Sequence, residues 1–172
     1  MTQFATSYSS DNISIGPCYV YFNGRHVGHT YGGVTLSLTQ NVYELKSDLF
    51  GETPVRVLDA GLVLEVTANL TEATFDNLKM LFASAVDNTT YLTFGKAVGG
   101  AITTGELVLE PTSGDEPVVQ IYKAAPNIGG AIEIAYTTDN QRVYECKFTG
   151  LIDDARTAGD MLFRIGGYSS AT

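Results

Sequence analysis

Two alternating stretches, residues 33–39 (GVTLSLT) and residues 61–70 (GLVLEVTANL), decide the fold of this chain. Successive side chains of a β-strand point to opposite faces of the sheet, so an alternation of apolar and polar residues is typical of a strand that buries one face. The apolar positions of the two stretches are Val34, Leu36, Leu38, Leu62, Leu64, Val66 and Ala68. The sequence therefore predicts two long half-buried strands.

A hairpin is predicted on the N-terminal side of the first stretch. Residues 18–22 are rich in aromatic residues, and they lead into Asn23-Gly24, a pair that tolerates the positive φ angles of a tight turn. A second strand is expected over residues 25–30. Residues 1–16 contain many Ser and Thr residues and show no periodic apolar face, so we expect an extended N-terminal arm there.

Residues 41–60 connect the two alternating stretches and break their pattern. Aromatic and aliphatic side chains are mixed with charges there, and the run Gly51-Glu52-Thr53-Pro54 interrupts the segment. Gly and Pro punctuate regular structure because one tolerates unusual φ angles and the other cannot donate a backbone hydrogen bond. We predict a long projecting loop or hairpin.

One helix is predicted over about residues 71–85. Thr71 is placed to cap the free amide groups of its first turn, and Glu72 lies where the helix dipole favours a negative charge. Apolar side chains then recur at helical spacing, which is typical of a helix that packs one face on a core. They are Phe75, Leu78, Leu81, Phe82 and Ala85.

The rest of the chain is predicted to form short strands separated by turns rich in Gly, Pro, Asn and Asp. The predicted strands are residues 91–94, 106–110, 118–124, 131–136, 142–149 and 161–165. We therefore predict a mainly β fold of antiparallel sheets, either a sandwich or a small barrel, with one packed α-helix. The length of 172 residues favours a single domain over residues 17–172.

Composition and charge argue against two classes of function. Nineteen acidic and ten basic residues give a net charge of −9, and the Lys and Arg residues are scattered singly. Binding of nucleic acid needs clustered cations that neutralise phosphates, so we expect no direct grip on DNA. No window approaches the roughly 20 apolar residues of a membrane span. The first ten residues lack the basic start and apolar stretch of an export signal, so we expect neither membrane insertion nor export.

We expect no enzymatic activity, no cofactor and no metal. His26 and His29 are the only histidines, and an offset of three residues points them to opposite faces of a strand. The strained Gly-x-Ser-x-Gly elbow of many hydrolases is missing. The carboxylate pairs Asp115-Glu116 and Asp153-Asp154 lie in predicted loops, where solvated charge is the usual role.

Cys18 and Cys146 lie in two predicted strands, far apart in the sequence. Two such residues build neither a zinc motif nor a dense disulfide scaffold. We expect buried free thiols, and a disulfide formed after release from the cell is the alternative.

A more specific pattern extends from residue 33 to residue 81: a strand, a long connection, a Gly-x-Thr-Pro turn, a second strand, and a helix opened by Thr-Glu-x-Thr-x-x-Asn-Leu. Its pieces are Gly33-Val34-Thr35-Leu36, Asp48-Leu49-Phe50-Gly51-Glu52-Thr53-Pro54-Val55, Gly61, and Leu70-Thr71-Glu72-Ala73-Thr74-Phe75-Asp76-Asn77-Leu78. Their order and spacing resemble those of the tail tube proteins of long-tailed bacteriophages, a family related to the tube proteins of contractile injection systems.

The resemblance implies a structural virion protein. Six copies would form a ring, strands from all six would close an inner barrel, and rings would stack head to tail into a hollow tube. Phage DNA would pass through this tail tube during ejection into the host. The implied partners are further copies of the chain and the tail sheath, tape measure, baseplate and tail terminator proteins. The tube would assemble in the cytoplasm of the host bacterium, without a membrane and without specific DNA contacts.

The resemblance also implies roles for two sets of residues. The connection after the first long strand would reach the neighbouring ring, through Tyr43, Leu45, Asp48, Leu49, Phe50, Gly51, Thr53 and Pro54. The polar faces of the two long strands would line the channel, with Thr35, Ser37, Thr39, Glu65, Thr67 and Asn69 as candidates. Burying Leu49 or Phe50 contributes on the order of 1.5–3 kcal/mol, so either a partner ring or the chain's own core is expected to cover them.

Two other functions stay open on the sequence alone. A carbohydrate-binding or adhesin-like β-sandwich module would display exposed aromatic residues in a cleft, which ten Tyr and eight Phe permit although Trp is absent. A small β-rich hydrolase would need a convergent site of titratable residues, which the sequence does not suggest.

Overall fold

The computed structural model describes residues 16–82, 85–95, 98–113, 116–127, 133–134, 136 and 138–168. Within them the chain forms β1 (Cys18–Phe22), β2 (Arg25–His26), β3 (Thr30–Ser47), β4 (Gly51–Leu70), α1 (Phe75–Leu81), β5 (Val86–Asp87), β6 (Leu92–Thr93), β7 (Gly105–Pro111), β8 (Val119–Pro126), β9 (Tyr144–Gly150) and β10 (Phe163–Ile165). The predicted N-terminal arm lies outside the described residues, apart from Gly16.

Eight strands form one antiparallel sheet in the order β2-β1-β7-β8-β9-β4-β3, with β10 added on β8. The sheet rolls back on itself, so that β1 faces β9 although β7 and β8 separate them in the sheet order. The ring centroids of Phe22 and Phe148, which belong to these two strands, lie 5.5 Å apart. β5 and β6 pair separately. The predicted mainly β fold with one helix is confirmed.

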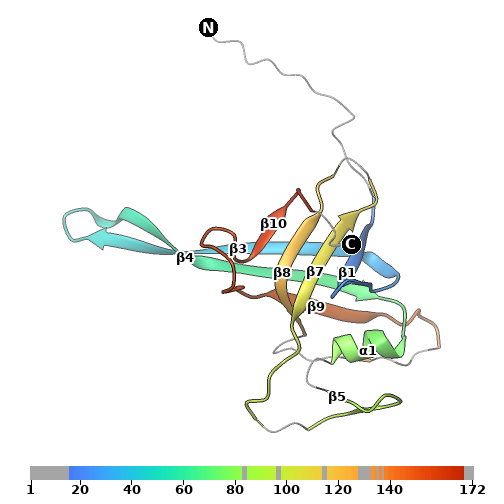
Figure 1. Cartoon of the computed structure of the whole chain (residues 1–172). Helices are drawn as coiled ribbons and strands as arrows, with labels where there is room; N and C mark the ends of the chain where they lie inside the picture. Colours follow the sequence, from blue (N-terminus) through green and yellow to red (C-terminus); the bar gives the residue numbers. More distant parts are fainter. Residues whose placement is uncertain are drawn as a thin grey trace.

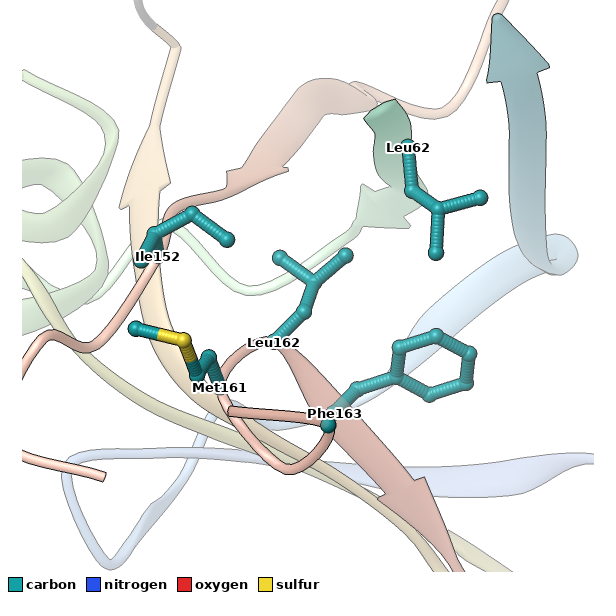
Figure 2. A pocket seen from close by; sticks show the side chains of 6 residues that line it. Leu62, Ile152, Met161, Leu162 and Phe163 are labelled. Atoms are coloured by element: carbon teal, nitrogen blue, oxygen red, sulfur yellow. The ribbon is translucent and has the colours of Figure 1, made fainter. Parts of the chain in front are cut away.

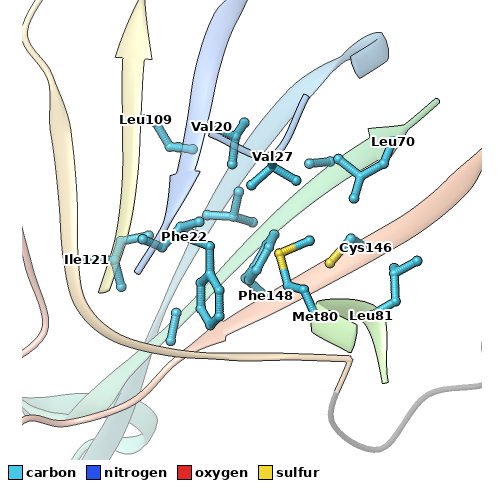
Figure 3. Close-up of a cluster of buried hydrophobic side chains, with 14 of the residues drawn as sticks. Val20, Phe22, Val27, Leu70, Met80, Leu81, Leu109, Ile121, Cys146 and Phe148 are labelled. Carbon is cyan, nitrogen blue, oxygen red and sulfur yellow. The ribbon is translucent and has the colours of Figure 1, made fainter. Parts of the chain in front are cut away.

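One hydrophobic core fills the inside of the rolled sheet (Figure 3). The alternation predicted for the second long strand is confirmed from Leu64 onward, because β4 buries Leu64, Val66, Ala68 and Leu70 completely while the residues between them stay half-exposed. Leu62, predicted on the same buried face, is exposed. These four side chains pack in one cluster with residues of β1, β7, β8 and β9. The partners are Val20, Phe22, Leu107, Leu109, Ile121, Tyr144, Cys146 and Phe148.

Helix α1 contributes Met80 and Leu81 to this core (Figure 3), but it is shorter than predicted. Thr71 is not its cap, because the Thr71 hydroxyl donates a 3.0 Å hydrogen bond to a backbone carbonyl of the connection before β3. The hydroxyl of Thr74 instead accepts the hydrogen bond from the Asn77 backbone amide, at 3.3 Å. Both threonines carry the same capping group, and the packing of residues 71–74 decides which one caps.

The other predicted strands are mostly present with shifted bounds. The Asn23-Gly24 turn has φ angles of 51° and 73°, which confirms the predicted hairpin. Its second strand is only β2, because Gly28, at a φ of 99°, redirects the chain before β3 begins. For the predicted strand 131–136, the described residues are Glu133, Ile134 and Tyr136. These three residues lie outside strands.

The predicted projection between the two long strands is a continuous β-hairpin. β3 and β4 stay paired from Thr30↔Leu70 to Ser47↔Gly51, and their far part extends to one side of the molecule (Figure 1). The register shifts between Asn41↔Gly61 and Val42↔Asp59, so Ala60 is an extra residue on β4 and forms a bulge. We call residues 38–63 the arm.

Strand β8 pairs with two strands along the same edge. β10 pairs with residues 119–121 and β9 with residues 124–126. The segment 151–162 runs between these two strands, and backbone hydrogen bonds fix both of its ends to β8. The Leu151 amide donates to the Lys123 carbonyl at 2.7 Å, and the Tyr122 amide donates to the Leu162 carbonyl at 3.2 Å.

The sheet splits where β4 enters the arm. The pairing of β4 with β9 ends at Glu65↔Thr149, and β4 then continues with β3 alone beside it among the described strands. Gly150 lies against Leu64 at this split: a Cβ atom on Gly150 would lie 3.0 Å from the Leu64 Cβ. Because Gly150 has no side chain, the end of β9 can approach β4 closely before the two strands separate.

Candidate functional site

The arm carries a large share of the exposed apolar surface of the described residues. Eleven of the 21 large hydrophobic side chains that are exposed lie on it. They are Leu38, Val42, Tyr43, Leu45, Leu49, Phe50, Val55, Val57, Leu58, Leu62 and Val63. Scattered exposed apolar residues are normal, but a concentration of them on one hairpin is typical of an interaction surface.

The tip of the arm is its most exposed part. Leu49 and Phe50 sit in the turn between β3 and β4, and their exposed fractions are 88% and 64%. The alternative that the chain's own core covers them is therefore wrong. The tip therefore exposes two large apolar side chains to solvent.

Both faces of the arm carry apolar side chains. In the shifted register Tyr43 lies opposite Leu58 on one face of the arm, and Val57 lies opposite Glu44 on the other face. Each face therefore carries some of the exposed apolar side chains. The eight residues predicted to contact a neighbouring ring all lie on this arm and are all exposed. They are Tyr43, Leu45, Asp48, Leu49, Phe50, Gly51, Thr53 and Pro54.

The six lumen-lining candidates lie together on the outward face of the sheet. Their cross-strand pairs are Thr35↔Thr67 and Ser37↔Glu65, while Thr39 lies opposite Val63. The sixth candidate, Asn69, follows on the same face of β4. These residues are exposed or half-exposed, namely Thr35, Ser37, Thr39, Glu65, Thr67 and Asn69. The structure therefore brings both predicted polar faces into one surface.

Strand β9 extends this polar surface with residues that sequence reasoning did not select. Glu145, Lys147 and Thr149 lie opposite Asn69, Thr67 and Glu65. The Lys147 ammonium lies 2.9 Å from the Glu65 carboxylate, so this surface mixes both signs of charge. The signal was present in the sequence, because Tyr144, Cys146 and Phe148 alternate with these three residues.

An apolar hollow of about 290 Å³ lies at the base of the arm. Leu62 from β4 forms one side of it, and Ile152, Met161, Leu162 and Phe163 form the other (Figure 2), with Gly159 completing the lining. All of these side chains are apolar. The hollow opens at the split of the sheet, where β4 parts from β9. Sequence reasoning missed it, because only the return of the segment 151–162 to β8 brings Ile152 and Met161 together.

The segment 151–162 is held in place by one arginine. The Arg156 guanidinium stacks over the Tyr122 ring at 3.5 Å and lies 3.4 Å and 3.3 Å from the carboxylates of Asp153 and Asp160. The Tyr122 hydroxyl donates a hydrogen bond to Asp160. Burial and this hydrogen bond raise the pKa of Tyr122. The wall of the hollow is therefore built on a fixed segment.

The described residues contain no group of three or more His, Cys, Asp or Glu side chains arranged to hold a metal ion. His26 packs edge-on against the rings of Tyr19 and Tyr21, and the His29 imidazole lies 3.8 Å from the Glu72 carboxylate. The two histidines thus have separate surroundings. Of the two predicted carboxylate pairs, Asp115 lies outside the described residues, and Asp153 belongs to the Arg156 cluster.

Both cysteines are free thiols, as expected, but only Cys146 is fully buried. Burial raises the pKa of the Cys146 thiol to about 12, against the opposing effect of a hydrogen bond from Asn127. Burial also raises the pKa of the half-buried Cys18 thiol. Because the thiolate is the reactive form of cysteine, neither environment is that of an activated nucleophile.

No protein-family model and no curated protein matches this chain. The helices of the described residues include none with the length and apolar character needed to cross a membrane.

Proposed function

We propose that the chain is a structural subunit that assembles with copies of itself into stacked rings, forming a hollow tube. The observation that carries this proposal is the arm: a hairpin that leaves the body and exposes apolar side chains on both faces and at its tip. An isolated two-stranded hairpin is marginally stable in water at best. Such an arm gains most from contact with another subunit.

Burial of the apolar side chains of the arm would supply the free energy for assembly. Burying a side chain such as Phe50 contributes on the order of 1.5–3 kcal/mol, and eleven large apolar side chains are exposed on the arm. Only a fraction of that gain has to be realised for association at micromolar concentration, which corresponds to about 8 kcal/mol.

A second driving force is the edge of the sheet at β3, which has no partner strand among the described residues. β3 is one end of the strand order, so its outer edge offers backbone hydrogen-bonding groups along Thr30–Ser47. A long free edge is an aggregation hazard in a monomer. In a ring of subunits it is paired with the next protomer, and the hazard becomes the means of assembly.

The polar surface of β3, β4 and β9 suits the wall of the channel. Its threonines, serine and asparagine hydrate the wall, and its ion pair between Lys147 and Glu65 leaves no cluster of cations to hold phosphates. With a net charge of −9 on each copy, such a wall repels DNA and lets it slide.

Together with the sequence pattern of residues 33–81, these features favour the tail tube of a long-tailed bacteriophage as the tube in question. In that setting six copies form each ring, and the sheath, tape measure, baseplate and terminator proteins are the further partners. The all-apolar lining of the hollow speaks against a sugar-binding cleft, which needs polar groups to fix its ligand.

Imaging the purified protein by negative-stain electron microscopy at rising concentration tests the proposal. We expect rings or hollow rods, with a matching rise in mass by analytical ultracentrifugation. A chain that stays a single particle of 18.4 kDa at every concentration overturns the proposal.

Thiol probes test the assignment of the channel wall. Ser37→Cys and Thr67→Cys, each in a Cys18→Ser background, are expected to react readily with a bulky thiol reagent in the free subunit. Assembly is expected to slow that reaction at least several-fold, because the reagent must then enter the tube. Equal rates before and after assembly reject the assignment, and Val86→Cys on the separate β5–β6 hairpin serves as the exposed control.

A further inference from the structure

Two exposed apolar features lie at opposite ends of the arm: the tip, formed by Leu49 and Phe50, and the hollow at the base. We propose that the tip of one copy inserts into the hollow of a second copy. This inference rests on the proposed function, since it names the surface that receives the arm. Its test is arranged so that it can fail while the assembly itself is confirmed.

The tip does not reach the hollow of its own chain. Leu62 of β4 lines the hollow, and Phe50, in the turn that precedes β4, lies twelve residues away along the chain. At about 3.3 Å per residue this separates the two by up to about 40 Å. The arm points away from the body that carries the rest of the lining (Figure 1). A second copy is therefore the occupant that brings a tip to this hollow.

The hollow and the tip match in size and chemistry. A volume of about 290 Å³ corresponds to roughly ten water molecules at about 30 Å³ each, which is room for a large apolar side chain. The side chains around it are aliphatic, aromatic or a thioether (Figure 2), and they offer a polar ligand no hydrogen bonds. Filling it with Phe50 or Leu49 removes apolar surface from water on both copies.

The backbone at the hollow also suits a hairpin as the incoming element. From residue 64 back to the tip, the edge of β4 that faces away from β3 has no partner strand among the described residues. A strand that follows the tip into the split of the sheet can pair with this edge. Main-chain pairing of this kind gives affinity, and the apolar hollow gives specificity.

This contact joins two different surfaces of one molecule, so it leaves a free tip and a free hollow on every pair of copies. It repeats from copy to copy and continues as an open chain of subunits unless the rotation between copies closes it into a ring. The distance between tip and hollow limits the offset between successive copies along the arm to about 40 Å. In the open form, this contact builds a stack.

Charge is not what joins these two surfaces. Lys46 pairs with Glu52 at the tip, and Arg156 pairs with two aspartates beside the hollow. Each copy carries a net charge of −9, which opposes association. Raising the salt concentration from about 0.05 M to about 0.5 M screens this repulsion and is expected to lower the concentration needed for assembly. A contact built on ion pairs would weaken instead.

Two variants separate the tip from the hollow. Phe50→Asp replaces an apolar side chain of the tip by a charge, and Ile152→Asp places a charge in the hollow. Both positions are largely exposed in the single chain, at 64% and 55%, so each variant is expected to fold and to unfold at the wild-type denaturant concentration. Ile102→Asp, at another exposed isoleucine outside the hollow, is the matched control and is expected to assemble like the wild type.

The mixing experiment is the decisive one. Alone, each variant is expected to stop at the same small particle, because every contact lacks one of its two surfaces. A 1:1 mixture of the two, prepared after each has reached its final size, is expected to double in mass and then stop. The intact hollow of Phe50→Asp receives the intact tip of Ile152→Asp. A mixture that grows no larger than its components, while wild-type protein forms tubes, overturns the inference and leaves the proposed function standing.

Cross-linking identifies the contact directly. Chains with Phe50→Cys and chains with Ile152→Cys, both in the Cys18→Ser background, are mixed under assembly conditions and oxidised. We expect a disulfide between one chain of each kind and at least tenfold fewer bonds between like chains. Bonds between two Phe50→Cys chains as the main product would show that tips meet tips, and the inference would fall.

Discussion

The arm and the body of the molecule are built from the same two strands but obey opposite rules of burial. In the body, β4 alternates strictly, and Leu64, Val66, Ala68 and Leu70 are fully buried. In the arm, apolar residues of the same strands are exposed on both faces. The difference follows from the neighbours, because β9 accompanies β4 only as far as Glu65. Burial is therefore decided by where β9, the third strand, ends, and beyond that point the apolar side chains of the arm stay exposed.

The largest effect expected from this comparison concerns stability. Leu64→Ala removes a fully buried side chain next to the split of the sheet and is expected to destabilise the fold by about 2–5 kcal/mol. Leu49→Ala makes the same chemical change at a position that is 88% exposed, and we expect a change within about 0.5 kcal/mol. Urea unfolding of the unassembled subunit measures both. Similar losses for the two variants would mean that the tip packs on its own body.

The buried thiol gives the next effect. The pKa of Cys146 is raised from 9.0 to about 12, so the unfolded chain loses the thiol proton at lower pH than the folded chain. Stability from this group is complete below pH 9 and is lost as the pH rises towards 12. At pH 11 the loss amounts to about 2–3 kcal/mol. Cys146→Ala is expected to lose less stability than wild type between pH 8 and pH 11. Parallel curves would contradict the burial of this thiol.

An arm thiol supplies the contrast. Leu49→Cys places the group at an 88% exposed position, where folding does not change its solvation. Its presence is expected to leave the pH dependence of unfolding as in the wild type. The same variant is expected to react with a thiol reagent at pH 8 at the rate of a free peptide, whereas Cys146 reacts only when the chain unfolds.

The arm's own effect is expected in assembly. Phe50→Ala removes about 1.5–3 kcal/mol of burial from each contact, which raises the concentration needed for assembly by about tenfold to a hundredfold. The unfolding of the subunit is expected to stay unchanged. Sedimentation across a concentration series measures the first quantity, and Tyr91→Ala, at an exposed aromatic residue outside the arm, is the control. Tubes that form at the wild-type concentration would remove the tip from the contact.

Much of the fold was predictable because its signals are local. The alternation in residues 61–70 identified the buried face of β4, and Asn23-Gly24 identified a hairpin turn from its tolerance of positive φ. The lengths of β3 and β4 were not predictable from the sequence, since the bulge at Ala60 and the end of β9 at Gly150 are consequences of strand pairing. The cap of α1 moved from Thr71 to Thr74 because the Thr71 hydroxyl is engaged by a distant carbonyl.

The candidate surfaces divide in the same way. The apolar tip and the polar faces were visible in the sequence, because each depends on neighbouring residues of one strand. The hollow was not, because Leu62 and Ile152 are brought together by two backbone hydrogen bonds that fix the segment 151–162 on β8. A surface formed by residues that are far apart in the sequence leaves no periodic pattern in that sequence.

The smallest expected effect is also the one with an informative sign. Glu52 pairs with Lys46 near the tip, and the Glu52 side chain is 95% exposed. An exposed ion pair contributes little, so Glu52→Gln is expected to change the stability of the subunit by less than about 0.5 kcal/mol. In assembly the same change removes a negative charge from a tip that approaches an acidic neighbour. We therefore expect a modest gain, about twofold in the concentration needed for assembly, opposite in direction to Phe50→Ala. A weaker assembly on loss of Glu52 would show that this carboxylate pairs with a cation of the next copy, and the apolar account of the contact would have to change.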